Sequence, residues 1–339
     1  MPLSNTPCSL PEALLHWATE TPDKIFIHSN RGNFSFAETQ AIAASLAGFL
    51  NKNELPSKTT ICLMLPRVPQ LIFAFLGATL ANCLPAPINY LEAPEHIKQV
   101  ITSLDPAVII VDEALISPEV RTFIQDYQAQ VLSISSPLAA GFLHWDQVIQ
   151  HPPLTELPTM GNLDDLAYLN FTTGSTGFPK GALCTQANLY WNTRSMVEAF
   201  ALTAEDVHLC MFASFAHPHE LFCRALYTGA SLVLLTTISP KTIIKAINTY
   251  QVSCMMGLAV MYKMMAKHCH GTALPSLRIA ESGGMFTSPA LHKAFQAAFQ
   301  LPILSVWGST ETTGVALANT LLGGYQVNGA MGLPCPYYQ

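Results

Sequence analysis

Charged side chains are scarce in this sequence: only 11% of its 339 residues are Asp, Glu, Lys or Arg. The 16 basic residues are outnumbered by 22 acidic ones, which gives a formal net charge of −6. A protein that binds nucleic acid regardless of base sequence needs a basic excess to displace counterions. The composition therefore argues against a nucleic-acid partner.

Long apolar runs and paired cysteines are also missing. The longest apolar run, residues 71–81, is short for a membrane-spanning helix of about 20 residues. No basic segment followed by an apolar one opens the chain, so we expect neither a signal peptide nor a transmembrane segment. None of the nine cysteines forms a Cys-x-x-Cys pair, which disfavours a zinc site and a disulfide framework. We expect reduced thiols in a cytoplasmic protein.

Apolar residues make up half of the chain, which is ample for a buried core and excludes a disordered protein. The length predicts about two domains, or one large composite α/β domain. The charged fraction lies well below the roughly 25% of ordinary globular domains. We therefore expect part of the surface to be covered by another domain or a subunit.

The first half of the chain alternates between short apolar strands and helices. Ser35 is expected to cap a helix that runs to Leu50, with Glu38 as its capping-box partner. Runs of Val and Ile such as residues 107–111 suit parallel strands that are covered on both faces. Further expected strands are 25–27, 60–65 and 84–88, and further expected helices are 10–19, one opened by Pro69, and 94–103.

A loop rich in Pro, His and Thr, residues 150–161, separates this half from a second one with the same rhythm. We place a boundary there, between an α/β subdomain at 1–160 and another at 161–318. Alternation of this kind predicts an α/β fold of stacked layers. The expected strands of the second half are 166–171, 208–212, 231–235, 254–256, 277–280 and 303–306; its expected helices are 186–199, 240–250, 260–268 and 288–299.

One segment, residues 169–181, concentrates four hydroxyl residues, three glycines and a lysine directly after an apolar strand. Glycine lets a backbone approach a ligand closely, and consecutive N–H groups in such a loop form an anion-binding concavity. Lys180 supplies positive charge. The segment lacks the Walker A spacing. It is interpreted as a phosphate-binding loop, and the alternative is a surface turn rich in Gly and Ser.

This segment closely resembles the phosphate-binding signature of the adenylate-forming superfamily, which includes acyl-CoA synthetases, aryl-acid ligases, luciferases and adenylation domains of nonribosomal peptide synthetases. The resemblance extends along the chain. Residues 280–285 resemble the adenine-binding segment, and 307–314 resemble the aromatic-Gly-x-Thr-Glu motif. The Gly-x-x-Gly-x-Pro element of that family is matched at 329–334. The opening at 21–24 and the stretches at 62–66 and 77–87 are also similar to family landmarks.

The resemblance implies that this chain uses ATP and Mg²⁺ to activate a carboxylic acid. Lys180 would assist catalysis and contact the phosphates, Thr310 would bond the α-phosphate, and Glu311 would hold Mg²⁺, which takes one or two carboxylates beside phosphate oxygens. The alternative for Glu311 is a carboxylate that favours a helix start. The implied nucleotide-binding residues are Thr172, Thr173, Gly174, Ser175, Thr176, Gly177, Lys180, Gly283, Gly284, Met285, Trp307, Gly308, Ser309 and Thr310.

Residues 212–221 match the place where acyl-activating and aryl-acid relatives carry an acid-binding histidine. His217 fits that position, with His219 second, although either could be a structural histidine with local hydrogen bonds. Amino-acid-activating domains have an Asp that holds the substrate ammonium where this chain has Ala216. A buried ammonium without an anion is costly, so an ordinary α-amino acid is disfavoured. Val306 would narrow the acid pocket and favour an aryl or short-to-medium acid.

By the family pattern, residues 319–339 would begin a small β-barrel subdomain, and a mobile C-terminal domain would follow that this sequence does not contain. We expect the chain alone to bind nucleotide weakly, adenylate poorly and form no thioester. The thiol acceptor implied by the family is coenzyme A or a phosphopantetheine carrier, such as an acyl or peptidyl carrier protein. Two alternatives stay open: an inert nucleotide-binding or carrier-docking module, and an amino-acid-activating domain.

Overall fold

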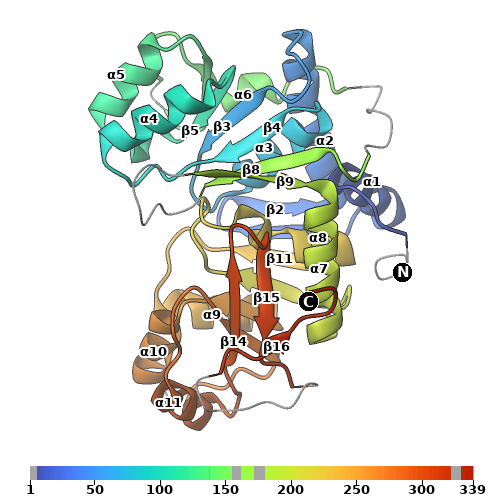
Figure 1. The fold of residues 1–339 in the computed structure, drawn as a ribbon, viewed down its shortest axis with the longest axis vertical. Coiled ribbons are helices and arrows are strands. Elements are labelled where there is room, and N and C mark those ends of the chain that lie inside the picture. Colours follow the sequence, from blue (N-terminus) through green and yellow to red (C-terminus); the bar gives the residue numbers. More distant parts are fainter. Residues whose placement is uncertain are drawn as a thin grey trace.

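The structure is a computed structural model, and it describes residues 6–136, 138–154, 162–171, 180–269, 271–321 and 330–338. Two layered β-sheets and a separate hairpin, each flanked by helices, make up its architecture (Figure 1). The expected α/β fold of stacked layers is confirmed. Within the described ranges, no helix combines the length and apolarity that crossing a bilayer requires.

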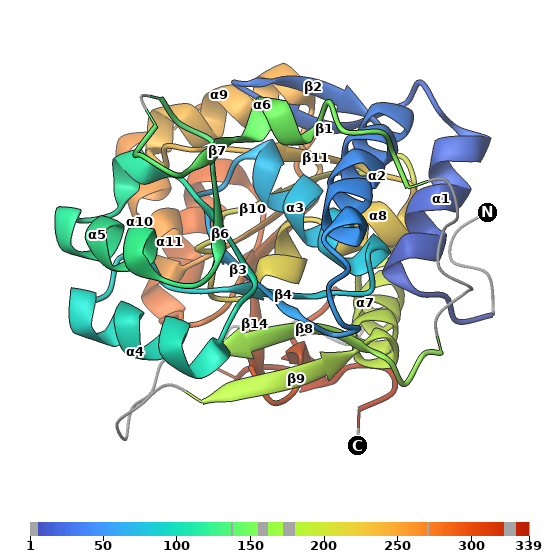
Figure 2. The same cartoon turned by 90° about the horizontal axis from the view of Figure 1, so that it is seen from above.

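The first sheet has five parallel strands in the order β4-β3-β5-β6-β7. Alternate side chains of β3 point to opposite faces, so Ile61 and Leu63 join the core under α2 and α3, whereas Cys62 and Met64 join the core under α4 and α5 (Figure 2). The strands are β3 (Thr60–Met64), β4 (Leu84–Pro87), β5 (Val108–Val111), β6 (Gln130–Ser133) and β7 (Leu143–His144), and the helices are α2 (Phe36–Lys52), α3 (Pro69–Leu80), α4 (Pro94–Leu104), α5 (Pro118–Asp126) and α6 (Trp145–Val148).

The second sheet has nine strands in the order β16-β15-β14-β13-β12-β10-β11-β1-β2. Its central strands are parallel, and antiparallel strands extend both edges. Helices α9, α10 and α11 cover one face, where Ile247, Tyr262 and Phe295 fill the core (Figure 1). The strands are β1 (Ile25–Ser29), β2 (Gly32–Ser35), β10 (Val207–Cys210), β11 (Ser231–Leu234), β12 (Cys254–Gly257), β13 (Ile279–Ser282), β14 (Leu304–Ser309), β15 (Gly314–Ala318) and β16 (Leu333–Pro334).

The hairpin formed by β8 (Leu166–Phe171) and β9 (Gly181–Thr185) is antiparallel, and β8 lies beside β4. The remaining helices are α1 (Leu10–Glu20), α7 (Gln186–Phe200), α8 (Cys223–Thr228), α9 (Pro240–Tyr250), α10 (Ala259–His268) and α11 (Pro289–Phe299), with short 3₁₀ helices η1 (Glu113–Leu115) and η2 (Pro218–Leu221).

Most of the expected elements are present, including the capping box between Ser35 and Glu38. Helices α5, α6 and α8 and strands β2, β6, β7, β9, β15 and β16 were not predicted. Strands β1 and β2 lie near the start of the chain but belong to the sheet of the second half, where β1 pairs with β11 and β2 pairs with β1. The boundary at 150–161 stays a prediction, and residues 155–161 lie outside the described residues.

Candidate functional site

Three of the predicted site segments lie at the carboxyl ends of neighbouring parallel strands of the second sheet, in which β10, β12, β13 and β14 lie side by side. Ligands of open parallel sheets bind at this edge, because the loops after the strands converge there. The acid segment, which we define as residues 212–221, follows β10. The adenine segment, residues 280–285, covers the end of β13 and the residues that follow it, and the β14–β15 turn, residues 310–313, follows β14.

Gly283 brings the acid and adenine segments together. A methyl group added to it would lie 2.9 Å from Cγ2 of Val306 and 3.5 Å from Cζ of Phe212. Gly284 has a φ of +71° and lies against Leu258, so a side chain there would be strained and crowded. At both positions, only glycine leaves the backbone uncovered between the neighbouring side chains.

Two other predicted nucleotide residues, Met285 and Trp307, expose large apolar side chains at this edge. The pairing of β14 with β15 shifts register between Trp307 and Gly308, and such a bulge re-aims a side chain. Trp307 remains 43% exposed, although the preceding Val306 is buried. Gly308 is required here, since a side chain would collide with the carbonyl oxygen of Gly314 at 2.0 Å.

The β14–β15 turn is braced by hydrogen bonds at both ends. The Ser309 N–H donates to Oγ1 of Thr312 over 2.9 Å, and the Thr312 N–H donates back to Oγ of Ser309 over 3.3 Å. The Tyr338 hydroxyl donates to the Thr312 carbonyl oxygen over 2.8 Å. Glu311 projects from this turn into solvent, and hydrogen bonds from its own backbone N–H and from Ser309 lower the pKa of its carboxyl.

The two predicted acid-binding histidines lie in different environments. His217 is partly exposed beside Phe212, with 6.5 Å between the ring centroids, and burial lowers its pKa. His219 is 1% exposed, and its Nδ1 shares a 2.8 Å hydrogen bond with the hydroxyl of Tyr168. Burial lowers the pKa of His219 to about 4, so its ring is neutral at pH 7. The structure thus brings His217, but not His219, to the edge with Gly283 and Val306.

The predicted phosphate loop can be located only by its flanks. Phe171 pairs with Gly181, so the loop joins the two strands of the β8–β9 hairpin. Lys180 is exposed just before β9. Residues Thr172, Thr173, Gly174, Ser175, Thr176 and Gly177 lie outside the described residues, as does Gly329.

The residues present fit a nucleotide and a divalent cation. Glu311 offers an ionised, solvent-facing carboxylate, which is the ligand type that Mg²⁺ prefers. Gly283 and Gly284 leave backbone uncovered where a flat ring could lie, and the exposed face of Trp307 can stack on an aromatic base. The described ranges contain no cluster of three or more His, Cys, Asp or Glu side chains able to form a metal cage.

Sequence reasoning missed a set of buried polar groups next to this edge. Arg67, which follows β3, donates to the carbonyl oxygens of Phe212 over 3.0 Å and of Leu235 over 2.9 Å. Arg224 and Glu281 are buried and paired with each other. The available signal was a lone charge inside an apolar run, as in Cys223–Thr228 and Ile279–Ser282, because such a charge must be paired when buried.

Comparison with protein families gives one match that spans almost the whole chain. The family described as "AMP-binding enzyme" matches residues 14–339.

Individual relatives are distant. The chain is 26% identical to 4-coumarate–CoA ligase 2 of Solanum tuberosum over 78% of its own length and 50% of that protein. It is 25% identical to tyrocidine synthase 3 of Brevibacillus parabrevis over 87% of its length, which is 4% of that synthase. The chain thus spans about half the length of the coumarate ligase that it matches.

Solved structures share the fold. A benzoate CoA ligase from Burkholderia xenovorans LB400 superposes with a TM-score of 0.88 at 23% identity, covering 98% of this chain and 66% of that one. The anthranilate CoA ligase AuaEII, solved with anthranoyl-AMP, gives a TM-score of 0.90 at 19% identity, covering 100% of this chain and 66% of that one.

Proposed function

We propose that this chain, which belongs to the AMP-binding enzyme family, is the large part of an enzyme that uses ATP to activate a carboxylic acid as an acyl-adenylate. The acyl group would then pass to a thiol, either coenzyme A or a phosphopantetheine carrier. The observation that carries the proposal is the convergence of Gly283, Val306 and the turn bearing Glu311 at one sheet edge of a chain from this family.

Adenylation must bring a carboxylate to a phosphate, so the enzyme has to offset the charge of two anions. In our proposal Lys180 and the loop 172–177 hold the outer phosphates, and the Thr310 hydroxyl donates to the α-phosphate that the acid attacks. Such preorganised donors stabilise charge as it develops in the transition state. Mg²⁺, when bound beside ATP, would neutralise phosphate charge, and Glu311 is the residue that would hold it.

The adenine base is assigned to the surface between the adenine segment and β14. Gly283 and Gly284 would admit the ring against the backbone, with Met285 and Trp307 as apolar neighbours. The exposed indole of Trp307 supports this assignment, because a flat ring can stack on a base.

The acid would lie against Phe212, His217 and Val306. Val306 fills the space beside Gly283 and leaves little depth between β13 and β14, which favours an aryl or short-to-medium acid. Relatives named for 4-coumarate, benzoate and anthranilate agree with this class. An α-amino acid, as the peptide-synthetase relative would suggest, is disfavoured because Ala216 provides no carboxylate for the ammonium.

The test is ATP–pyrophosphate exchange by the full-length protein that contains this chain, with a panel of aryl, short-chain and amino acids. We expect exchange that depends on an aryl or short-to-medium acid. Nucleotide binding without exchange for any acid would instead favour an inert binding module. Exchange only with an α-amino acid would overturn the assignment of the acid class.

Lys180→Ala examines the phosphate assignment separately. Loss of a charge-assisted contact should weaken ATP binding by about 1.5–3 kcal/mol in titration calorimetry. Lys180 is exposed, so the denaturation midpoint should barely move. Lys267→Ala, on α10, is a matched control of the same charge change. Equal ATP affinity in wild type and Lys180→Ala would contradict the role of Lys180.

The acceptor and the cellular location belong to the same proposal. A cytoplasmic enzyme fits the abundance of free cysteines, because thiols stay reduced there. Coenzyme A and a loaded carrier protein can be separated by supplying each as acceptor and detecting the thioester by mass spectrometry.

A further inference from the structure

Three charged side chains lie together in the interior, next to the candidate site. Arg224, on α8, donates from Nη1 to Oε1 of Glu281 over 2.6 Å, and its Nε lies 3.1 Å from Oε2 of Glu220. The side chains of Arg224, Glu220 and Glu281 are only 7%, 3% and 1% exposed. We refer to these three residues as the buried charge unit. One guanidinium thus pairs with two carboxylates from different elements.

Direct bonds satisfy only part of this unit. Within the described part of the chain, five polar atoms of the unit and of the neighbouring His208 lack a direct hydrogen-bond partner: Glu220 Oε1, Arg224 Nε, Arg224 Nη2, Glu281 Oε2 and His208 Nε2. These four residues, together with five apolar or sulfur-containing residues, line a cavity of about 10 Å³. That volume and that many polar neighbours suit one internal water molecule, which typically makes two to four hydrogen bonds. We therefore expect one ordered water to complete the unit.

Residues of the unit lie in or contact three segments of the proposed site: the acid segment, strand β13 and the start of β15. Glu220 lies within the acid segment, three residues after His217, and Glu281 lies in β13, two residues before Gly283. Glu220 also accepts a hydrogen bond from the Val315 backbone N–H. A methyl group added to Gly314 would lie 2.8 Å from Oε1 of Glu220, so β15 begins in contact with this carboxylate.

Stability alone does not account for these charges. Replacing a buried ion pair or triad by apolar side chains of similar volume is often neutral or stabilising. Burial raises the pKa of Glu281 despite its bond to Arg224, which shows that the second carboxylate is accommodated at a cost. Arg224 does provide fixed geometry, because its planar guanidinium hydrogen-bonds Glu281 and forms an ion pair with Glu220, which limits where the two carboxylates can lie.

We propose that Arg224 is a positioning residue of the adenylation site, which acts through Glu220 and Glu281 to hold the acid segment, the adenine strand and the β14–β15 turn in register. This inference rests on the proposed function. The alternative is that the unit merely stabilises the fold, like any other internal ion pair.

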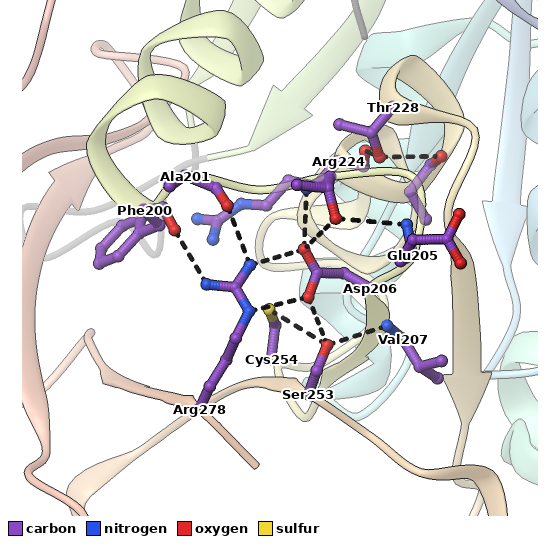
Figure 3. A network of polar contacts seen from close by, with 12 residues as sticks. Phe200, Ala201, Glu205, Asp206, Val207, Arg224, Thr228, Ser253, Cys254 and Arg278 are labelled. Carbon is purple, nitrogen blue, oxygen red and sulfur yellow. Dashed lines mark hydrogen bonds and ion pairs between the residues drawn. The ribbon is translucent and has the colours of Figure 1, made fainter. Parts of the chain in front are cut away.

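The chain offers a matched control at the opposite end of the same strands. Asp206, just before β10, accepts hydrogen bonds from Arg278 and Ser253, which precede β13 and β12 (Figure 3). We call Asp206, Ser253 and Arg278 the amino-end clamp. The clamp joins neighbouring strands at their amino ends, away from the site edge, whereas the buried charge unit joins α8, the acid segment and β13.

The experiment measures pyrophosphate exchange per folded molecule for Arg224→Lys and for the control Asp206→Asn in the full-length protein. Lysine keeps the charge but not the two-sided fork, and small misplacements cost about 10²-fold in rate. We expect kcat to fall about tenfold to a hundredfold in Arg224→Lys and to stay at the wild-type value in Asp206→Asn. Unchanged kcat and KM in both variants would overturn the proposal.

Two milder variants keep the test open if Arg224→Lys does not fold. Glu281→Gln retains the Arg224–Glu220 pair and should raise the KM for ATP more than that for the acid. Glu220→Gln should do the reverse, because Glu220 belongs to the acid segment. A role limited to stability predicts no such split between the two KM values.

A readout without catalysis separates this proposal from the proposed function. 5-Fluorotryptophan reports on Trp307 by ¹⁹F NMR, with its signal assigned through Trp307→Phe. We expect that signal to shift in Arg224→Lys and to stay in place in Asp206→Asn. If wild type exchanges no pyrophosphate, the proposed function fails. An unmoved Trp307 signal in Arg224→Lys would remove the positioning role whatever the kinetics.

Discussion

The buried charge unit and the amino-end clamp both place charged side chains against the second sheet, but they differ in how those charges are paired and how exposed they are. In the clamp, one arginine pairs with one aspartate, and each of its three nitrogens donates to an oxygen: Arg278 binds both Asp206 oxygens and the carbonyl oxygens of Phe200 and Ala201. Its side chain is 41% exposed. In the buried charge unit, one arginine serves two carboxylates, its side chain is 7% exposed, and several polar atoms lack direct partners.

The difference follows from position. The clamp joins the amino ends of β10, β12 and β13, where no loop of the proposed site lies. Its polar groups can therefore bond to one another and remain partly exposed to water. The buried charge unit lies where the acid segment, β13 and β15 meet, and some of its polar atoms have no direct hydrogen-bond partner. Buried polar atoms are normally hydrogen-bonded, and departures from such rules are expected at functional sites.

The largest contrast is expected on removing each arginine. Arg224→Met leaves two carboxylates buried without a cation and should lower the free energy of unfolding by about 3–5 kcal/mol. Arg278→Met should cost about 1–2 kcal/mol, because the Arg278 side chain is 41% exposed and Asp206 keeps its bonds from Ser253 and Thr203. Urea denaturation of both variants measures the two losses. Equal losses would mean that the two clusters do not differ as described.

His219, which lies beside the buried charge unit with Nε2 3.9 Å from Oε1 of Glu220, and Asp206 of the amino-end clamp should lose stability in different pH ranges. Burial lowers the pKa of His219 from 6.5 to about 4, so between these values the unfolded chain binds a proton that the folded chain does not. Stability at this group therefore falls as the pH drops from 6.5 to 4, by about 3 kcal/mol at most. Burial alone would raise the pKa of Asp206, but bonds from Arg278, Ser253 and Thr203 lower it to about 2. Its contribution, about 1–2 kcal/mol after solvent screening, falls between pH 3.8 and 2.

Denaturation midpoints measured across pH separate these windows. The difference between wild type and His219→Gln should change between pH 6.5 and 4, and the difference between wild type and Asp206→Asn should change only below pH 3.8. Glu281 acts with the opposite sign, since its pKa is raised and the folded chain takes up that proton first. Repeating the His219 comparison in a Glu281→Gln background removes its effect. A single shared window for both groups would contradict the prediction.

A smaller effect is expected from crowding the buried charge unit without removing charge. Gly314→Ala places a methyl group 2.8 Å from Oε1 of Glu220 and 3.0 Å from Nε2 of His219, at a φ of +155°. Gly271→Ala is the matched control, because Gly271 has a φ of +83° and open space around it. We expect Gly271→Ala to cost about 1 kcal/mol from backbone strain alone, and Gly314→Ala to cost about 2 kcal/mol or more. Thermal denaturation of the two variants tests this, and equal costs would show that Glu220 moves aside freely.

The sequence predicted the elements whose signals are local. Helix α9 was expected at its observed bounds because Pro240 opens it and its apolar residues recur at helical spacing. Helix α8 was missed because it has only six residues and is buried on all sides, so it shows no amphipathic period. Strand β9 was missed because only its pairing with β8 defines it.

Only those parts of the candidate site that lie in sequence motifs were predicted. The adenine segment and the Trp307–Glu311 stretch lie at one edge of the second sheet, their nucleotide-binding roles stay predictions, and most of the phosphate loop lies outside the described residues. The buried charge unit could not be predicted as a cluster. Arg224 and Glu281 are 57 positions apart in the chain, and only the packing of α8 on the sheet brings them to 2.6 Å.

The smallest structural effect, and the sharpest functional one, is expected at Glu311. Glu311→Gln should leave the denaturation midpoint unchanged, because the side chain is exposed and the turn is held by Ser309 and Thr312 rather than by the carboxylate. One carboxylate is a poor cage for Mg²⁺, so the metal should bind weakly without nucleotide. Titration of ATP at rising Mg²⁺ should therefore show a strong metal dependence in wild type and a reduced one in Glu311→Gln. Glu205→Gln, another exposed carboxylate, serves as the control. An identical Mg²⁺ dependence in wild type and Glu311→Gln would mean that another group holds the metal. The exposed turn would then have no direct role in metal binding to contrast with the positioning role of the buried charge unit.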